Sequence, residues 1–245
     1  MGSITDRELV REALSNVDVI LHTATLHKPH VVTHSKQNFI DTNISGTLVL
    51  LEEAALAGIK RFVYTSTTST YGSSLKPADN APATWVDEAL GWSLPKNIYG
   101  VTKLAGENMC ALFSVKHDVN CIILRTSRFF PEADDNTDRR NNFSDTNLKA
   151  NEFLYRRVDL EDVVTVHELA LQKTKTLRFG RYVISATSPF KKKDLKNLRK
   201  DPVAVITGYF PDFIKIYRDA GFKMFKDIER VYVNDLKFSW MDTEI

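Results

Sequence analysis

Tyr99 and Lys103 are the two residues of this sequence whose types and spacing best suit proton transfer. They lie four positions apart, so on a helix their side chains share one face, about one turn from each other. An ammonium group beside a phenol favours the phenolate and lowers the tyrosine pKa from its usual value of about 10. The pair therefore predicts an acid/base group that works near neutral pH, provided that a helix carries both residues.

The spacing alone is weak evidence for chemistry, because chance supplies it readily. A chain of 245 residues with 8 Tyr and 19 Lys contains roughly 0.6 such pairs at random. A solvated helix face is the simpler explanation of one isolated pair. The case for a catalytic pair therefore depends on the elements that surround it.

The composition excludes several classes of protein. A net charge of +2 gives no indication of nucleic-acid binding. No apolar run approaches the length that spans a membrane. Cys110 and Cys121 are too few for a disulfide framework, which favours a reducing compartment. We therefore expect a soluble, cytoplasmic protein that acts on a small molecule and has no nucleic-acid or membrane partner.

Apolar segments that alternate with helical patterns predict a parallel sheet. Strands are predicted at 17–24, 61–66 and 119–125, and helices at 5–15, at 35–57 with a bend near 43–46, and from Tyr99 to about Lys116. This order is typical of about half of a doubly wound α/β sheet. The segment 73–96 contains three Pro and two Trp, and we expect it to form a packed lid or wall.

The pattern is less regular after Arg128. We expect a surface loop at 132–147, a helix that ends near Leu171 and a strand at 180–185. The lysine-rich segment 191–200 predicts a basic helical face, which is either solvated or in contact with an anionic partner. These features suggest a core at 1–128 and a small, mostly helical lobe at 129–245, packed by aromatic residues, whose strand at 180–185 returns to the core.

Several further motifs stand in a fixed order around the pair. A strand ending in Tyr64-Thr65-Ser66-Thr67 is followed by Tyr71-Gly72 and then by Tyr99-x-x-x-Lys103. Asn43-x-x-Gly46-Thr47, Leu124-Arg125 and the segment 158–163 complete the set. This order resembles the extended short-chain dehydrogenases/reductases, also called the NAD-dependent epimerase/dehydratase family, over nearly the whole chain. The resemblance implies a Rossmann-like, doubly wound parallel sheet with a substrate lobe.

The resemblance also implies residue roles. Tyr99 would be the catalytic acid/base, Lys103 its electrostatic partner and a ligand of the nicotinamide ribose, and Thr67 the hydroxyl that binds the substrate oxygen. Independently of the family, a hydroxyl at the carboxyl end of a strand lies where open α/β sheets bind ligands. The residues expected along an NAD or NADP cofactor are Ser3, Ile4, Thr23, Ala24, Thr25, His27, Asn43, Ser66, Tyr99, Lys103, Thr126 and Ser127.

The substrate side is less specific. Thr67, Thr68 and Arg128 are expected to contact the substrate, a sugar or small molecule with a secondary alcohol or carbonyl group. Arg128 and Phe129 stand where many sugar-nucleotide enzymes of the family carry Asn and Pro, which argues against a nucleotide sugar. His27, His30 and His34 could suggest a metal site, but Pro29 interrupts their helical spacing, so no metal is predicted.

The glycine-rich turn of the family, Gly-x-x-Gly-x-x-Gly, does not occur in this sequence. Because the backbone of that turn approaches the cofactor pyrophosphate, we expect cofactor binding to be impaired. We also expect that the first two strands and most of the third are missing, which would leave 17–21 as an exposed sheet edge. Two hypotheses follow: an NAD(P)-dependent oxidoreductase, epimerase or dehydratase, or a non-catalytic binding protein or inactive remnant of the same fold. The family also suggests a homodimer through the Tyr99 helix and the long helix before it.

Overall fold

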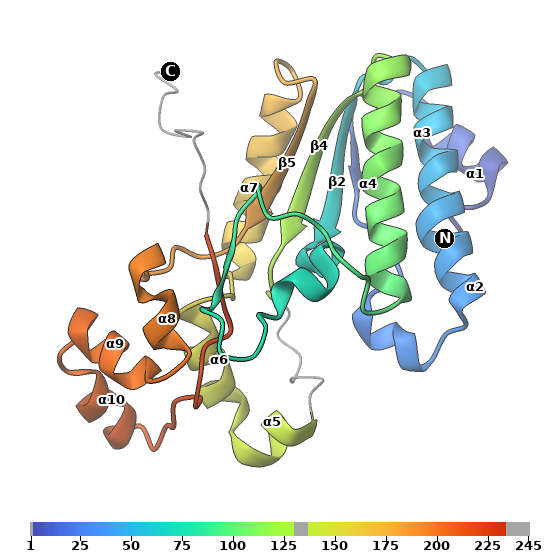
Figure 1. Cartoon of the computed structure of the whole chain (residues 1–245). Helices are drawn as coiled ribbons and strands as arrows, with labels where there is room; N and C mark the ends of the chain where they lie inside the picture. The colour runs from blue at the N-terminus through green and yellow to red at the C-terminus, as the bar shows by residue number, and fades with distance from the viewer. Residues whose placement is uncertain (1, 130–136, 234–245) are drawn as a thin grey trace. The chain divides into compact units, whose positions relative to one another are not determined.

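The computed structural model describes residues 2–129 and 137–233 (Figure 1). Its contacts divide the chain into two compact units that alternate along the sequence. Unit 1 takes its residues from Met1–Ser74, Gly91–Thr126 and Leu160–Arg181, and unit 2 from Leu75–Leu90, Ser127–Asp159 and Tyr182–Ile245. The domain division at residue 128 stays a prediction, because these units follow contacts rather than chain order.

A parallel sheet with the strand order β1-β2-β4-β5 forms the centre of unit 1. Its strands are β1 (Ile20–His22), β2 (Arg61–Thr67), β4 (Asn120–Thr126) and β5 (Phe179–Ile184). β1 pairs with β2 in parallel, and β2 pairs with β4 in parallel with Thr67 opposite Thr126. The predicted strands are therefore present, and the register brings the carboxyl ends of β2 and β4 together.

Helices cover both faces of this sheet, as a doubly wound fold requires. α3 (Gly46–Leu56) and α4 (Ile98–Lys116) contact each other, and α4 packs on β2 and β4. α7 (Leu160–Lys173) contacts the same two strands from the opposite face in Figure 1, while α1 (Arg7–Ala13) packs on α3. No helix within the described residues is long and apolar enough to cross a membrane.

The long helix predicted at 35–57 is present and contains a π-helical segment. α2 (Lys36–Phe39) continues into the π-helix η2 (Ile40–Ser45) and then into α3. The helix begins at the N-cap Ser35, and Gly58 follows its end with a φ of 72°. The π-helical turn contains Asn43 and coincides with the predicted bend. Such turns often occur at functional sites.

The first strand is shorter than predicted. Only Ile20–His22 of the segment 17–24 is a strand, and Thr23 and Ala24 follow it as exposed coil. Within the described part of the chain β1 pairs with β2 alone, and the side chain of Leu21 is 44% exposed. The described structure therefore contains the apolar sheet edge that the sequence indicated.

The segment 73–96 is not a wall built by two packed tryptophans. Residues Thr84–Val86 form β3 in unit 2, and Trp85 is partly buried there. Trp92, in unit 1, is 67% exposed. The prediction fails at Trp92, where the backbone of the next two residues bonds to Tyr71 and Ser73 and Trp92 remains outside the packing.

Unit 2 has its own core, and most of its regular elements are helices. Its elements are β3, α5 (Thr137–Asn142), α6 (Asp145–Phe153), the 3-10 turn η4 (Lys192–Asp194), α8 (Leu195–Leu198), α9 (Pro202–Tyr209), α10 (Phe213–Asp219) and β6 (Arg230–Tyr232). β3 and β6 pair in parallel, and Tyr155, Phe190, Phe213 and Phe225 pack with Leu198 and Ile206. The aromatic packing expected in this part of the chain is thus present, while the bounds of the lobe stay a prediction.

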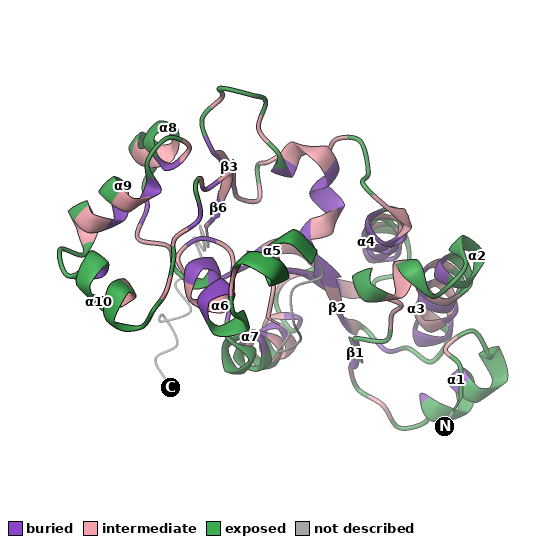
Figure 2. Ribbon diagram, turned by 90° about the horizontal axis from the view of Figure 1, so that it is seen from below, coloured by how far each residue is buried: buried purple, intermediate pink, exposed green. Residues whose placement is uncertain are grey.

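The surface loop predicted at 132–147 is largely helical where the structure describes it. Residues 130–136 lie outside the described residues, while α5 and α6 take up most of the remainder. α6 starts there because the side chain of Ser144 accepts a hydrogen bond from the backbone of Asn147. Figure 2 shows buried residues along α4 and largely exposed residues on α10.

The close packing of α4 on β2 at Gly106 gives a first prediction. A Cβ at this position would lie only 2.7 Å from Cζ of Tyr64. We expect Gly106→Ala to lower the free energy of unfolding by about 1–3 kcal/mol, because overpacking forces the core to shift. Urea unfolding measures this. Gly208→Ala in α9 is the control, since its Cβ would meet no atom within 4 Å; equal stability of both variants would contradict the packing.

Candidate active site

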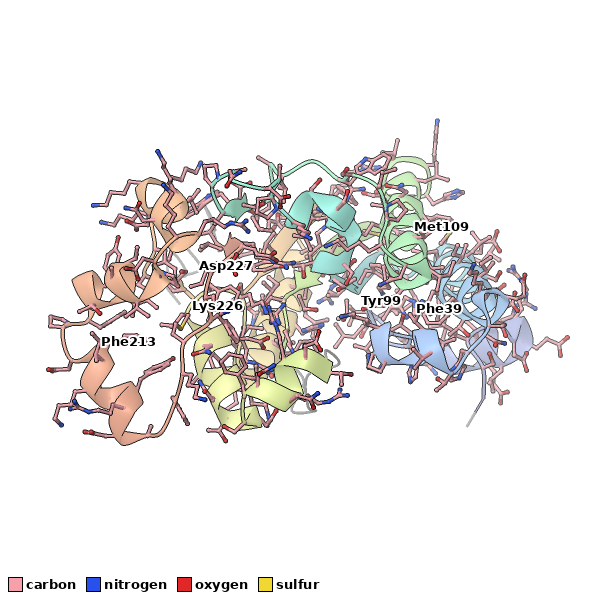
Figure 3. All side chains as sticks on the ribbon, turned by 60° about the horizontal axis from the view of Figure 1, so that its bottom comes forward. Phe39, Tyr99, Met109, Phe213, Lys226 and Asp227 are labelled. Carbon is pink, nitrogen blue, oxygen red and sulfur yellow. The ribbon has the colours of Figure 1, made fainter. Side chains whose placement is uncertain are left out.

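Tyr99 and Lys103 both lie on the buried face of α4. Tyr99 is 8% exposed and Lys103 is 1% exposed, so neither belongs to a solvated helix face. The helix begins beside them because the side chain of Asn97 accepts a hydrogen bond from the backbone of Gly100. Figure 3 shows Tyr99 near the start of α4 and Met109 further along the same helix. The predicted shared face is therefore present.

Thr67 reaches Tyr99 from the last position of β2. Its hydroxyl acts on the phenol of Tyr99 and lowers the pKa of that phenol. The hydroxyl of Thr67 also accepts a hydrogen bond from the backbone of Ser69 at 3.1 Å, which begins the turn after the strand. The structure thus places two of the three predicted catalytic residues near each other at the carboxyl end of β2.

The phenolate predicted for Tyr99 does not form in the protein alone. Burial raises the pKa of Tyr99 to about 12, and the nearby Thr67 hydroxyl only partly opposes this. The physical reason is desolvation, which disfavours the charged form of a phenol. Tyr99 therefore holds its proton at neutral pH.

Lys103 has an unusual environment for a cation. Burial lowers the pKa of Lys103 to about 7, although Cys110 and Glu107 act in the opposite direction. Its Nζ lies 3.9 Å from the ring centroid of Tyr64. Among the described residues no hydrogen-bond acceptor contacts this Nζ, so its donors are available to an oxygen atom of a ligand.

The side chain of Asn43, predicted to contact the cofactor, is fully used within unit 1. Its amide oxygen accepts from the backbone of Leu26 at 2.8 Å and from the hydroxyl of Thr25 at 3.0 Å. Its amide nitrogen donates to the carbonyl of Leu26 at 2.9 Å and to the hydroxyl of Thr102 at 3.0 Å. Asn43 therefore ties the loop after β1 to α4 and positions the site.

Ser66 and Thr126, also predicted along the cofactor, join neighbouring strands. The hydroxyl of Ser66 donates to Oε1 of Glu107 at 2.6 Å. The hydroxyl of Thr126 donates to the carbonyl of Ser66 at 3.0 Å. Both side chains are buried, and both hydroxyl donors are used within the protein.

Sequence reasoning missed Glu107, the centre of this polar network. Its buried carboxylate accepts two hydrogen bonds from Arg125, at 3.0 Å from Nε and 2.7 Å from Nη2, and lies 3.3 Å from Nε of Arg181. Two signals could have indicated it. Glu107 follows Lys103 by four residues on the same helix face, and Arg125 ends the predicted strand at 119–125.

The other residues predicted along the cofactor in unit 1 have varied environments. Ser3 is exposed and bonds to Thr5, while the side chain of Ile4 lies against Gly46. Thr25 and His27 are partly buried, and the rings of His27 and His30 are 4.5 Å apart. Within the ranges that the structure describes, no group of three or more His, Cys, Asp or Glu is arranged to hold a metal ion.

Of the predicted substrate residues, Thr68 is buried after β2 in unit 1 and Arg128 lies in unit 2. Arg128 belongs there to a group of arginines around the buried Glu152, with Nε 3.7 Å from its carboxylate. Ser127, predicted at the cofactor, is also in unit 2. Its backbone donates to Ile184 at 2.8 Å, and its buried hydroxyl has no hydrogen-bond partner among the described residues.

Comparison with known proteins decides the family. A model of the NAD dependent epimerase/dehydratase family matches residues 1–185. The chain belongs to this family. It is 34% identical over 126 residues to UDP-glucose 4-epimerase of Rhizobium meliloti, covering 51% of this chain and 36% of that protein. It is 30% identical over 131 residues to dTDP-glucose 4,6-dehydratase of Streptomyces niveus, covering 53% and 37%. The chain thus spans less than half the length of these curated relatives.

Solved structures share the fold. UDP-glucose 4-epimerase of Thermus thermophilus, in complex with NAD, superposes with a TM-score of 0.61 and 20% identity, covering 96% of this chain and 76% of that one. UDP-Glc/GlcNAc 4-epimerase of Campylobacter jejuni gives a TM-score of 0.63 and 17% identity, covering 96% and 74%. At these identities the likeness establishes the Rossmann-like fold alone.

The Glu107 network gives a second prediction. Glu107→Gln leaves the guanidinium of Arg125 buried without its counter-charge, so we expect the free energy of unfolding to fall by about 3–5 kcal/mol. Urea unfolding is the measurement. Asp118→Asn is the control, because the pair of Asp118 with Lys60, at 2.7 Å, is largely exposed and should contribute little to stability. Equal losses in the two variants would show that the network does not hold the core together.

Proposed function

We propose that this chain carries the catalytic residues of an NAD(P)-dependent oxidoreductase of the epimerase/dehydratase type. Its substrate would be a secondary alcohol or carbonyl group of a sugar or another small molecule. The burial of Tyr99 on α4, where the Thr67 hydroxyl at the carboxyl end of β2 acts on its phenol, carries this proposal. Lys103 supports it, because it lies one helical turn from Tyr99 on the same buried face.

Each residue has a distinct proposed role. Tyr99 keeps its proton at neutral pH because burial raises its pKa, so it can donate that proton to a carbonyl oxygen. In the opposite direction Tyr99 must accept a proton, and a nearby Lys103 ammonium would reduce the cost of the phenolate. The hydroxyl of Thr67 would hold the same substrate oxygen in place.

The residues of unit 1 fit the nicotinamide end of the cofactor. A bound nicotinamide would accept or return the hydride. Lys103 offers N–H donors that no described residue uses, as a ribose hydroxyl would require. Both NAD and NADP remain candidates, and the proposed cofactor contacts of Ser127 and substrate contacts of Arg128 remain predictions.

Tyr99→Phe tests the catalytic role, because it removes only the phenolic oxygen. We expect turnover to fall by about 10²–10⁴-fold, the usual contribution of a general acid/base. Absorbance of the reduced nicotinamide, followed over a panel of sugars, sugar phosphates and small carbonyl compounds, measures it. Tyr209→Phe is the control, since the hydroxyl of Tyr209 binds Asp194 in unit 2. Normal turnover in Tyr99→Phe would refute the role of Tyr99.

The second candidate is a non-catalytic binding protein or inactive remnant of the same fold. The raised pKa of Tyr99, about 12, favours it, because burial leaves the phenol without the activation that a general base needs near neutral pH.

Thermal unfolding with NAD or NADP at millimolar concentration separates the two candidates. A ligand that binds the native state at 100 times its dissociation constant stabilises it by about 2.7 kcal/mol. The enzyme hypothesis predicts a higher melting temperature with one of the two nucleotides, and a smaller shift in Lys103→Met. The remnant hypothesis predicts no shift with either nucleotide. AMP serves as the control for binding that does not involve the nicotinamide.

The homodimer suggested by the family remains a proposal. Leu56 on α3 and Leu112 and Val115 on α4 are exposed apolar side chains on the two helices concerned. Sedimentation equilibrium would decide the oligomeric state.

A further inference from the structure

The ammonium of Lys103 lies over the face of the Tyr64 ring. The Nζ is 3.9 Å from the ring centroid, within the range of a cation–π interaction. Tyr64 is fully buried in β2 and Lys103 is buried on α4, so the contact joins the sheet to the helix that carries Tyr99. The attraction between a cation and the negative face of a ring is greatest where water is excluded.

The Tyr64 ring is the group that contacts this charge directly. Glu107 favours the cation through its charge, but its oxygens already accept hydrogen bonds from Ser66 and Arg125. Within the described ranges, no carbonyl, hydroxyl or carboxylate oxygen accepts a hydrogen bond from the Nζ of Lys103. The ring face therefore stabilises the buried charge of Lys103, as water or a carboxylate does for most lysines.

We propose that Tyr64 is a positioning residue of this site, whose ring face keeps Lys103 in its ammonium form and holds that ammonium between β2 and α4. The role of Tyr64 in catalysis rests on the proposed function. The contact between the ring and the ammonium does not depend on that function, and it can be tested in protein without substrate or cofactor.

The charge of Lys103 is sensitive to this contact. Burial lowers the pKa of Lys103 to about 7, so a neighbour that stabilises or destabilises the ammonium changes its charge near neutral pH. Loss of the cation–π contact should lower this pKa by about one further unit.

The other titratable groups that face Lys103 are not expected to obscure its titration. Burial, aided by Lys103, lowers the pKa of His22 on β1 to about 3, while burial raises the pKa values of Tyr64 and Tyr99 well above neutrality. Burial likewise raises the pKa of Cys110 on α4. Glu107, the remaining group, is paired with Arg125.

A series of ring substitutions at position 64 tests the proposal. The protein is labelled with lysine that carries carbon-13 at Cε, and the Lys103 signal is assigned by its loss in Lys103→Met. Its NMR titration is then followed in the wild type, in Tyr64→Phe and in a variant with pentafluorophenylalanine at position 64. Fluorination withdraws electron density from the ring face while leaving an aromatic ring of similar shape. Tyr64→Leu and Tyr64→Met provide non-aromatic side chains should the fluorinated variant fold poorly, and near-ultraviolet circular dichroism verifies the fold of each protein.

We expect the wild type and Tyr64→Phe to titrate together, because both keep an electron-rich ring. The fluorinated and aliphatic variants should titrate about one pH unit lower. One common midpoint in all variants would overturn the proposal, and so would a shift in Tyr64→Phe as large as that in the fluorinated variant. If the proposed function also holds, the pH profile of turnover should shift in the same variants. If the titration shifts as expected but no variant, including the wild type, shows turnover, the proposed function is refuted and the proposed effect of Tyr64 on Lys103 is supported.

Discussion

The buried carboxylate of Glu107 fixes α4 relative to the sheet. It binds Arg125 from β4 and Ser66 from β2 and lies near Arg181 from β5, so one side chain links a helix to three strands. A buried charge is costly unless all of its partners are in place, and a different position of the helix would leave charges unpaired. Tyr99 and Lys103 lie on the same helix and acquire their positions from this constraint.

The polar groups around the site divide into two kinds. The Asn43 amide makes four hydrogen bonds within the protein, and the Ser66 and Thr126 hydroxyls donate to protein acceptors, so these side chains hold backbone segments in place. Lys103 has donors that the described protein does not use. Saturated groups give a site its rigidity, whereas unused donors are available to a ligand. The motif order therefore contains residues that position the site as well as the proposed catalytic residues.

Burial sets the electrostatics of the pair more strongly than proximity does. It raises the pKa of Tyr99 and lowers that of Lys103. Each group therefore keeps its neutral form over a wider pH range in the protein than it would in water. The interactions that oppose this trend come from Thr67 at the phenol and from Cys110 and Glu107 at the amine. In the proposed reaction a proton would thus move between groups whose charges are stabilised by a few specific neighbours.

The sequence by itself determined the order of the strands and helices, the shared face of Tyr99 and Lys103, and the family. These features follow from local periodicity, caps and motif order, which can be read from the sequence without knowledge of distant contacts. Only the tertiary structure decided the direction of the Tyr99 pKa, the place of Lys103 over Tyr64, the saturation of Asn43 and the exposure of Trp92. Desolvation and hydrogen-bond saturation depend on residues far apart in the sequence, such as Asn43 and Thr102. The Tyr-x-x-x-Lys spacing therefore predicts where the pair lies, and its neighbours across the fold set its charge.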